Sequence, residues 1–237
     1  METKEHQNTD KYIKALTEIS RAINSDLYLE EILKLIVMVT AQVTGVDICS
    51  LWLMEEDKEP RELRLKATQT IDPDYVKDRV LSVNEGVVGH VAASENPLLV
   101  WDVLEEPRFK EKEMARKMGL KSLASVPLKL RDEKVIGVLN CFTMEYHDFT
   151  ATEVNLIKAV ANQAAVAIFN SELMVKTRVI QEELETRKLV ERSKEVLMRR
   201  MQISAEEAYR WIQKKSMDSR KPMRQVAEAI LLSEDMY

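Results

Sequence analysis

The chain has 237 residues, of which 45% are hydrophobic and 32% are charged, and its formal net charge is −5. This length gives room for one large or two modest domains, and the hydrophobic fraction is enough for a packed core. No apolar run approaches the roughly 18 residues of a membrane span, and the N-terminus METKEHQNTDKY contains no apolar signal segment. The two cysteines lack CxxC spacing. From these three observations we expect a cytoplasmic protein without membrane contact.

Two amphipathic helices are predicted near the N-terminus. Residues 10–25 carry a narrow apolar seam at steps of four, three and four, formed by Tyr12, Leu16, Ile19 and Ile23. A seam this narrow suits a partner helix, so residues 1–27 are expected to be a dimerisation helix. Residues 29–44 have a wider apolar face, and Gly45 is the expected left-handed stop.

The next hundred residues alternate short strands with short helices. Strands are predicted at 46–55, 61–69, 98–103, 122–130 and 134–144, mostly as antiparallel hairpins. Gly86 and Gly89 are expected ahead of one short helix, and Gly119 is expected to end another. Because strands and helices mix without a regular parallel alternation, the fold class is α+β, an antiparallel sheet with flanking helices.

A long helix is predicted from Thr152 to about Met201, opened by a capping box in which Thr150 is the N-cap and Glu153 reaches back. Two successive apolar seams run along this helix. The first is formed by Ile157, Ala161, Ala164, Ile168, Ser171 and Val175, and the second by Leu173, Ile180 and Leu184. A helix of about 50 residues is about 75 Å long. We expect residues 171–200 to be a coiled coil with a second copy, giving a parallel homodimer.

Two shorter helices are predicted to close the chain. Ser204 and Glu207 form a second capping box at the start of a helix over 205–215, and Pro222 fits the first turn of a last helix ending near Leu232. Small and apolar positions would pack both helices on the end of the long one: Ala208, Ile212, Val226, Ala227 and Ile230. The result is a three-helix unit at the C-terminal end.

This end of the chain is basic while the rest is acidic. Between Arg187 and Arg224 twelve basic residues oppose five acidic ones, so the segment has a charge of +7 within a chain of −5. Such an asymmetry is typical of a module that contacts a polyanion, although a solvated helix face can have the same composition.

Catalytic and metal-binding patterns are absent from the sequence. His6, His90 and His147 have no metal-ligand spacing, and no GxSxG, Walker loop or paired-carboxylate motif is found. Cys49 and Cys141 stand apart among apolar neighbours and are expected to be small core residues. Trp52 and Trp101 could wall a pocket, but a core position is the commoner case for large aromatics. We expect no enzyme activity, no metal and no cofactor.

Residues 28–175 resemble a GAF domain. The patches NEGVVGHVA, LLVWDVLEEPRF, GLKSLASVPL, KVIGVLNCF and FTATEVNLIKAVANQAAVAI stand in that family's order and spacing. The resemblance implies a sensor domain, placed at 28–170, with an unidentified small-molecule effector. The Asn-Lys-Phe run of cyclic-nucleotide-binding members is missing.

Residues 180–232 resemble the ANTAR domain, the RNA-binding module of bacterial transcription antiterminators. The matching residues are Lys194, Leu197, Met198, Ser204, Glu207, Ala208, Tyr209, Ile212, Ser216, Met217, Arg220, Lys221, Val226 and Ala227. Ser193 and Glu195 depart from the frequent alanine and glycine. The resemblance implies a three-helix RNA-binding domain, placed at 180–237, in a dimer that binds paired RNA hairpins of a nascent transcript.

The resemblance and the charge together select a set of candidate RNA-binding residues: Arg192, Lys194, Arg199, Tyr209, Arg210, Lys214, Lys215, Ser216, Arg220, Lys221 and Arg224. Arginine can fork onto phosphate, and Tyr209 or Trp211 could stack on an unpaired base. Because adjacent helical residues diverge by about 100°, one of these two aromatics is expected in the core and the other at the surface.

The sequence therefore predicts a dimeric transcription antitermination regulator with a GAF sensor and an ANTAR RNA-binding end. The alternative is a GAF-type signalling scaffold whose C-terminal helices bind a protein partner. An enzyme within the GAF part is a weaker alternative. DNA as the polyanion is also weaker, since the short final helix has few residues placed to read a major groove.

Overall fold

The computed structural model describes residues 17, 29–55, 59–70, 79–130 and 134–234. The expected dimerisation helix at 1–27, apart from Thr17, and the polar turn at 131–133 lie outside the described residues. The chain divides into two compact units, Met1–Glu172 and Leu173–Tyr237. Each unit has its own apolar core.

The first unit contains an antiparallel sheet, as the sequence predicts, but with six strands where five are predicted, because β3 is missing from the prediction. In chain order its strands are β1 (Ile48–Glu55), β2 (Glu62–Thr68), β3 (Val80–Ser82), β4 (Leu98–Val100), β5 (Ser122–Lys129) and β6 (Val135–Thr143). Their order across the sheet is β3-β2-β1-β6-β5-β4. The two central strands β1 and β6 come from opposite ends of the domain sequence, so the sheet cannot form until the whole segment has folded back on itself.

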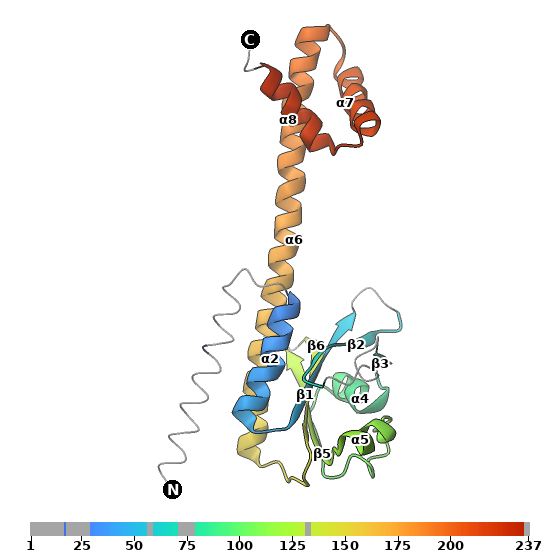
Figure 1. The fold of residues 1–237 in the computed structure, drawn as a ribbon, viewed down its shortest axis with the longest axis vertical. Coiled ribbons are helices and arrows are strands. Elements are labelled where there is room, and N and C mark those ends of the chain that lie inside the picture. Colours follow the sequence, from blue (N-terminus) through green and yellow to red (C-terminus); the bar gives the residue numbers. More distant parts are fainter. Residues whose placement is uncertain (1–16, 18–28, 56–58, 71–78, 131–133, 235–237) are drawn as a thin grey trace. The chain divides into compact units, whose positions relative to one another are not determined.

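Helices cover both faces of this sheet (Figure 1). On one face α2 (Leu29–Thr44) and the first turns of α6 (Ala151–Met201) pack in a single apolar cluster with β1, β5 and β6. On the other face α4 (Gly86–Ser94) and α5 (Lys112–Met118) pack in a second cluster with Trp52, Leu123 and Phe142. Because successive side chains of a strand point to opposite faces, β1, β5 and β6 each supply residues to both clusters.

Several predicted boundaries are correct and others are wrong. Helix α2 has the predicted bounds, and Gly45 adopts the expected left-handed conformation, with φ 74°. Gly86 and Gly89 do not precede α4: Gly86 is its first residue and Gly89 lies inside it, where an added Cβ would meet the Ser82 carbonyl oxygen at 2.3 Å. Close approach of the backbone requires Gly89 to be glycine.

Strand β4 is shorter than predicted. It ends at Val100, and the ring of Trp101 is 57% exposed and stacks on Tyr146 with ring centroids 5.5 Å apart. The expectation of a core position is therefore wrong for Trp101. It is correct for Trp52, which is 2% exposed and donates its indole N–H to the Ser50 hydroxyl at 3.3 Å.

Helix α6 begins where the capping box predicts. The Thr150 hydroxyl accepts from the Glu153 amide at 3.3 Å, and the Glu153 carboxylate accepts from the Thr150 amide at 2.8 Å. Most of the first predicted seam is not free to pair with a second copy, because its first four residues, Ile157, Ala161, Ala164 and Ile168, are buried in the core of the first unit. In this part of α6 the regular spacing of apolar residues therefore serves to bury the helix in the domain core.

The second unit packs α7 (Ala205–Ser219) and α8 (Met223–Glu234) against the C-terminal turns of α6. The five predicted contact residues are all in its core, together with Val190, Val196 and Leu197. Helix α7 opens with the predicted capping box at Ser204 and Glu207 and runs to Ser219, four residues beyond the predicted end. Helix α8 begins after Pro222, whose carbonyl accepts from the Val226 amide at 3.3 Å.

Among the described helices, none combines the length and the apolar composition that crossing a membrane requires.

Candidate nucleic-acid interface

The turn between α7 and α8 is held by one serine side chain. The Ser216 hydroxyl donates to the Lys221 carbonyl at 2.5 Å, and the Lys221 amide donates to the Ser216 carbonyl at 3.1 Å. Arg220 ends α7 in the left-handed conformation, with φ 52°, a position usually given to glycine or asparagine. The turn therefore has a defined backbone on which its side chains are displayed.

Four basic side chains project from this region, which we call the basic turn: Lys214, Lys215, Arg220 and Lys221. All four are exposed, and among the described residues they form no ion pair or side-chain hydrogen bond. They lie at the C-terminal end of α7, where the helix dipole is negative and favours cations. Unpaired cations at one place on the surface are the arrangement that phosphate binding needs.

Three other predicted RNA-binding residues are paired with carboxylates in the same unit. Lys194 lies 2.9 Å from Glu191, and Arg210 lies 2.6 Å from Glu206. Arg224 lies 3.0 Å from Glu228 and 3.6 Å from Glu185. Hydrogen bonding to Glu228 raises the pKa of the Arg224 guanidinium, opposed by desolvation. Each of these cations is therefore partly neutralised by a neighbouring carboxylate, unlike the four of the basic turn.

Arg192 and Arg199 are exposed on α6, and Ser193 between them is buried. The Ser193 hydroxyl donates to the Val190 carbonyl at 2.9 Å. The residue that departs from the family pattern is thus accommodated within the core of the unit. Its inward position explains why a small side chain is required there.

Both aromatic residues of α7 are at the surface. Tyr209 is 43% exposed and Trp211 is 37% exposed, so the expectation that one of them is in the core is wrong. The core positions of α7 are Ala208 and Ile212, and the two aromatics flank them on opposite sides.

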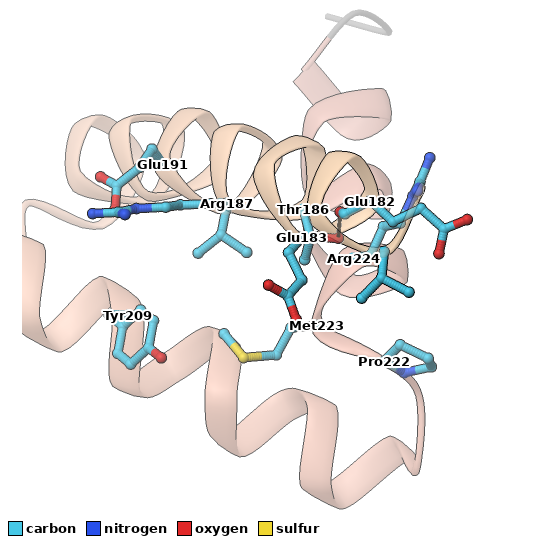
Figure 2. A pocket seen from close by; sticks show the side chains of 11 residues that line it. Glu182, Glu183, Thr186, Arg187, Glu191, Tyr209, Pro222, Met223 and Arg224 are labelled. Atoms are coloured by element: carbon cyan, nitrogen blue, oxygen red, sulfur yellow. Dashed lines mark hydrogen bonds between the residues drawn. The ribbon is translucent and has the colours of Figure 1, made fainter. Parts of the chain in front are cut away.

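A cleft with a volume of about 660 Å³ lies on the Tyr209 side of the unit (Figure 2). It is lined from α6 by Val179, Glu182, Glu183, Thr186, Arg187, Val190 and Glu191, and from the other helices by Tyr209, Pro222, Met223 and Arg224. Three carboxylates face it against two guanidinium groups, one of which, Arg224, also pairs with Glu185. The charged groups of this lining sum to −1, whereas the basic turn attracts a polyanion with four positive charges.

The structure thus distributes the eleven predicted residues over several faces. Lys214, Lys215, Arg220 and Lys221 gather at the basic turn, while Tyr209 and Arg224 line the cleft. Ser216 supports the turn from within. Sequence reasoning did not find the pairing of the cations with glutamates, although the i,i+4 spacing of Arg210 and Glu206 was a usable signal.

A small cavity of about 30 Å³ lies in the first unit, between the sheet and α4 and α5. Trp52, Phe109, Met114 and Phe142 supply apolar walls and Asn140 supplies an amide. The side-chain oxygen of Asn140, Oδ1, accepts a hydrogen bond from the buried Ser125 hydroxyl at 2.6 Å. The cavity in this form is far below the roughly 300–1,000 Å³ of pockets for drug-sized ligands.

Metal chemistry finds no support in the described part of the chain, where no three His, Cys, Asp or Glu side chains are grouped to hold a metal ion. His90 is partly buried, and the ring of His147 contacts Glu153 at 3.1 Å and packs edge-on against Phe149. His147 is accounted for by these contacts at the start of α6.

Comparison with known families identifies two domains. A family model of the GAF domain matches residues 28–168, and one of the ANTAR domain matches residues 178–231. The C-terminal part is 46% identical over 52 residues to the transcriptional regulatory protein PdtaR of Mycobacterium tuberculosis, which covers 22% of this chain and 25% of that protein.

The N-terminal part has more distant relatives. It is 24% identical over 168 residues to the methyl sulfide methyltransferase-associated sensor of Methanosarcina acetivorans, covering 69% of this chain and 17% of that protein. The GAF domain of a phosphoenolpyruvate-protein phosphotransferase from Coxiella burnetii superposes with a TM-score of 0.61 at 25% identity, over 70% of this chain and 97% of that domain. The chain thus spans a quarter or less of the length of these two curated relatives.

Proposed function

Since the chain belongs to the GAF domain family and carries an ANTAR domain after its GAF domain, we propose that it is an RNA-binding transcription antitermination regulator. Its domain content is that of a regulator, a GAF sensor followed by an ANTAR output domain. In this proposal the ANTAR domain binds paired hairpins in a nascent transcript and prevents the terminator from forming.

The observation that carries the proposal is the basic turn. Its four cations are exposed and have no carboxylate partner among the described residues, whereas Lys194 and Arg210 each have one and Arg224 has two. Affinity for RNA is dominated by release of counterions from phosphates, which needs such cations. Since the turn backbone is fixed by Ser216, the cations do not have to be gathered before binding.

We further propose that the protein acts as a homodimer through the second seam of α6. Leu173, Ile180 and Leu184 are 50%, 64% and 51% exposed in the single chain. Apolar residues at steps of seven and four form a narrow stripe of the kind buried between two parallel helices. Two copies would present two basic turns, one for each hairpin.

The GAF domain is proposed to bind a small effector and to have no catalytic activity of its own. The cavity beside Trp52 and Asn140 is where an effector would enter, by displacing α4 or α5 from the sheet. Binding there would alter how the two copies of α6 pair and so change RNA binding. Crosslinking between copies across Leu173–Leu184 would then change on addition of effector, and an unchanged pattern would count against this coupling.

The test is RNA binding by the purified full chain. Affinity for a two-hairpin leader RNA is measured against a scrambled RNA across a salt series, with Lys214, Lys215 and Arg220 replaced by alanine in parallel. The expected result is specific binding that the triple variant loses. The proposal would be rejected if the chain bound both RNAs equally and only at background affinity, both with and without its residues 1–172.

A protein-binding scaffold is the second candidate, and the cleft beside Tyr209 favours it, because its apolar and acidic lining suits a basic protein segment better than RNA. Under this alternative, the normal chain binds RNA only at background affinity, and charge reversal at Lys214 and Lys215 does not change that affinity. Loss of a partner on substitution of Glu183 or Met223 would support it.

A further inference from the structure

The two cysteines face each other across neighbouring central strands. Cys49 on β1 is the register partner of Cys141 on β6, although the two are 92 positions apart in sequence. Their sulfur atoms are 3.7 Å apart, and neither residue is exposed. The sequence alone predicts two separate core residues, and their pairing is a feature that the proposed function does not use.

We propose that Cys49 and Cys141 are a modification site that forms a reversible disulfide when the protein meets a two-electron oxidant of the peroxide class. Directly opposite residues of antiparallel strands have Cα atoms about 4.5–5.5 Å apart, within the range of about 4.4–6.8 Å that a disulfide spans. The sulfur atoms therefore come into bonding distance by small side-chain rotations, and the strands keep their register.

The reaction needs no group beyond the two thiols and the peroxide. One thiolate attacks a peroxide oxygen, so that an S–O bond forms, the O–O bond breaks and the leaving hydroxide takes up a proton as water. The second thiol then attacks the sulfenic sulfur, so that the S–S bond forms, the S–O bond breaks and a second water leaves. Two thiols and one hydrogen peroxide give one disulfide and two waters.

Burial sets the rate of this reaction. Burial raises the pKa of the Cys49 thiol, and the hydrogen-bonded Cys141 thiol raises it further. The raised pKa keeps the Cys49 thiol protonated at rest, and burial shields both sulfur atoms from oxidants, in contrast to exposed reactive cysteines. Cys49 is the second residue of β1 and Cys141 the third from the end of β6, so opening of the strand ends exposes the pair without unfolding the sheet.

The bond would form inside the core that the sheet shares with α2 and α6. Both cysteines belong to the apolar cluster that contains Ile36 of α2 and Ile157 and Ala164 of α6. A covalent link between the two central strands at this place restricts the opening of the GAF core. The oxidised protein is therefore expected to unfold at a higher denaturant concentration than the reduced protein.

The experiment exposes the full-length chain to hydrogen peroxide under native conditions and maps its peptides without reduction. The expected result is a crosslinked peptide pair containing Cys49 and Cys141, lighter by two hydrogen atoms than the separate peptides and split by dithiothreitol. The oxidised protein also unfolds at a higher urea concentration. The single variants Cys49→Ser and Cys141→Ser show no such shift.

Three results would overturn the proposal: thiols that stay reduced until urea unfolds the chain, sulfinic acid on one cysteine without a crosslink, or crosslinks only between different molecules. If a serine variant does not fold, Cys49→Ala and Cys141→Ala take its place as apolar replacements. The readout does not involve RNA. A negative result here therefore leaves the proposed function untouched, and failure of the proposed function leaves this proposal untouched.

Discussion

The Ser216 hydroxyl donates a hydrogen bond of 2.5 Å to the Lys221 carbonyl, and this bond spans the turn on which the basic side chains stand. Sequence reasoning placed Ser216 among the residues that contact RNA. The contact found for its hydroxyl is within the chain, so the geometry assigns it the role of holding Arg220 and Lys221 in place.

Replacing Ser216 by alanine is expected to lower the free energy of unfolding of the second unit by about 1 kcal/mol, since one hydrogen bond is lost. Amide hydrogen exchange at the end of α7 measures it. Ser219→Ala is the matched control, because its hydroxyl bonds within the helix, to the Lys215 carbonyl at 2.6 Å, and alanine has the better helix propensity. Equal acceleration of exchange in both variants would refute the assignment.

Replacing Lys214 and Lys215 by alanine is expected to weaken binding to specific and scrambled RNA by a similar factor. Each lost phosphate contact reduces the slope of log affinity against log salt by about 1. Filter binding or fluorescence anisotropy over a salt series gives both quantities. Lys176→Ala, an exposed lysine on α6 outside the ANTAR match, is the control and leaves the slope unchanged.

Replacing Gly89 by alanine is expected to destabilise the first unit by about 1–3 kcal/mol or more, the range for overpacking. Its Cβ would lie 2.3 Å from the Ser82 carbonyl oxygen and 2.9 Å from the Asn84 nitrogen, both of which are backbone atoms. Gly45→Ala has no atom within 4 Å of its Cβ and incurs only the strain of a positive φ. Urea denaturation compares the two, and a larger loss at Gly45 would contradict the packing argument.

Lowering the pH is expected to weaken the start of α6 through Glu153. Burial would raise the pKa of this carboxyl, but hydrogen bonds from Thr150 and the charge of His147 lower it below its usual value. A group with a lowered pKa in the folded state stabilises the fold above its unfolded pKa, about 4.3, and this contribution is lost as the pH falls through the folded pKa. Stability measured from pH 7 to 3 should therefore fall less steeply for Glu153→Gln. The exposed Glu172→Gln should follow the normal curve.

Replacing Ile180 by aspartate is expected to dissociate the proposed dimer, because it puts a charge in the middle of the apolar seam. Sedimentation equilibrium measures the mass of the complex. Met174→Asp is the control, since Met174 is 61% exposed on the same helix and falls outside the seam of Leu173, Ile180 and Leu184. A monomeric normal chain, or dissociation by both variants, would reject this seam as the interface.

The C-terminal unit was the more predictable part. The capping box at Ser204 and Glu207 and the five core residues of α7 and α8 are predicted from local sequence, and the structure confirms them. Helical caps and apolar periodicity act over a few residues, so local sequence is sufficient for them. The short strands were less predictable: the sequence predicts no strand at β3, and it predicts β4 three residues too long, because both are defined by pairing with neighbours distant in sequence.

The sequence by itself determined the α+β class, the order of the two domains, the long helix and the excess of basic residues at one end. Tertiary structure alone decided which cations stay unpaired, that Tyr209 and Trp211 are both exposed, and that the first seam of α6 is core. It also brought Cys49 beside Cys141 across 92 positions. The physical reason is range: propensity and charge are properties of neighbouring residues, whereas burial and pairing depend on segments that meet only when the chain folds.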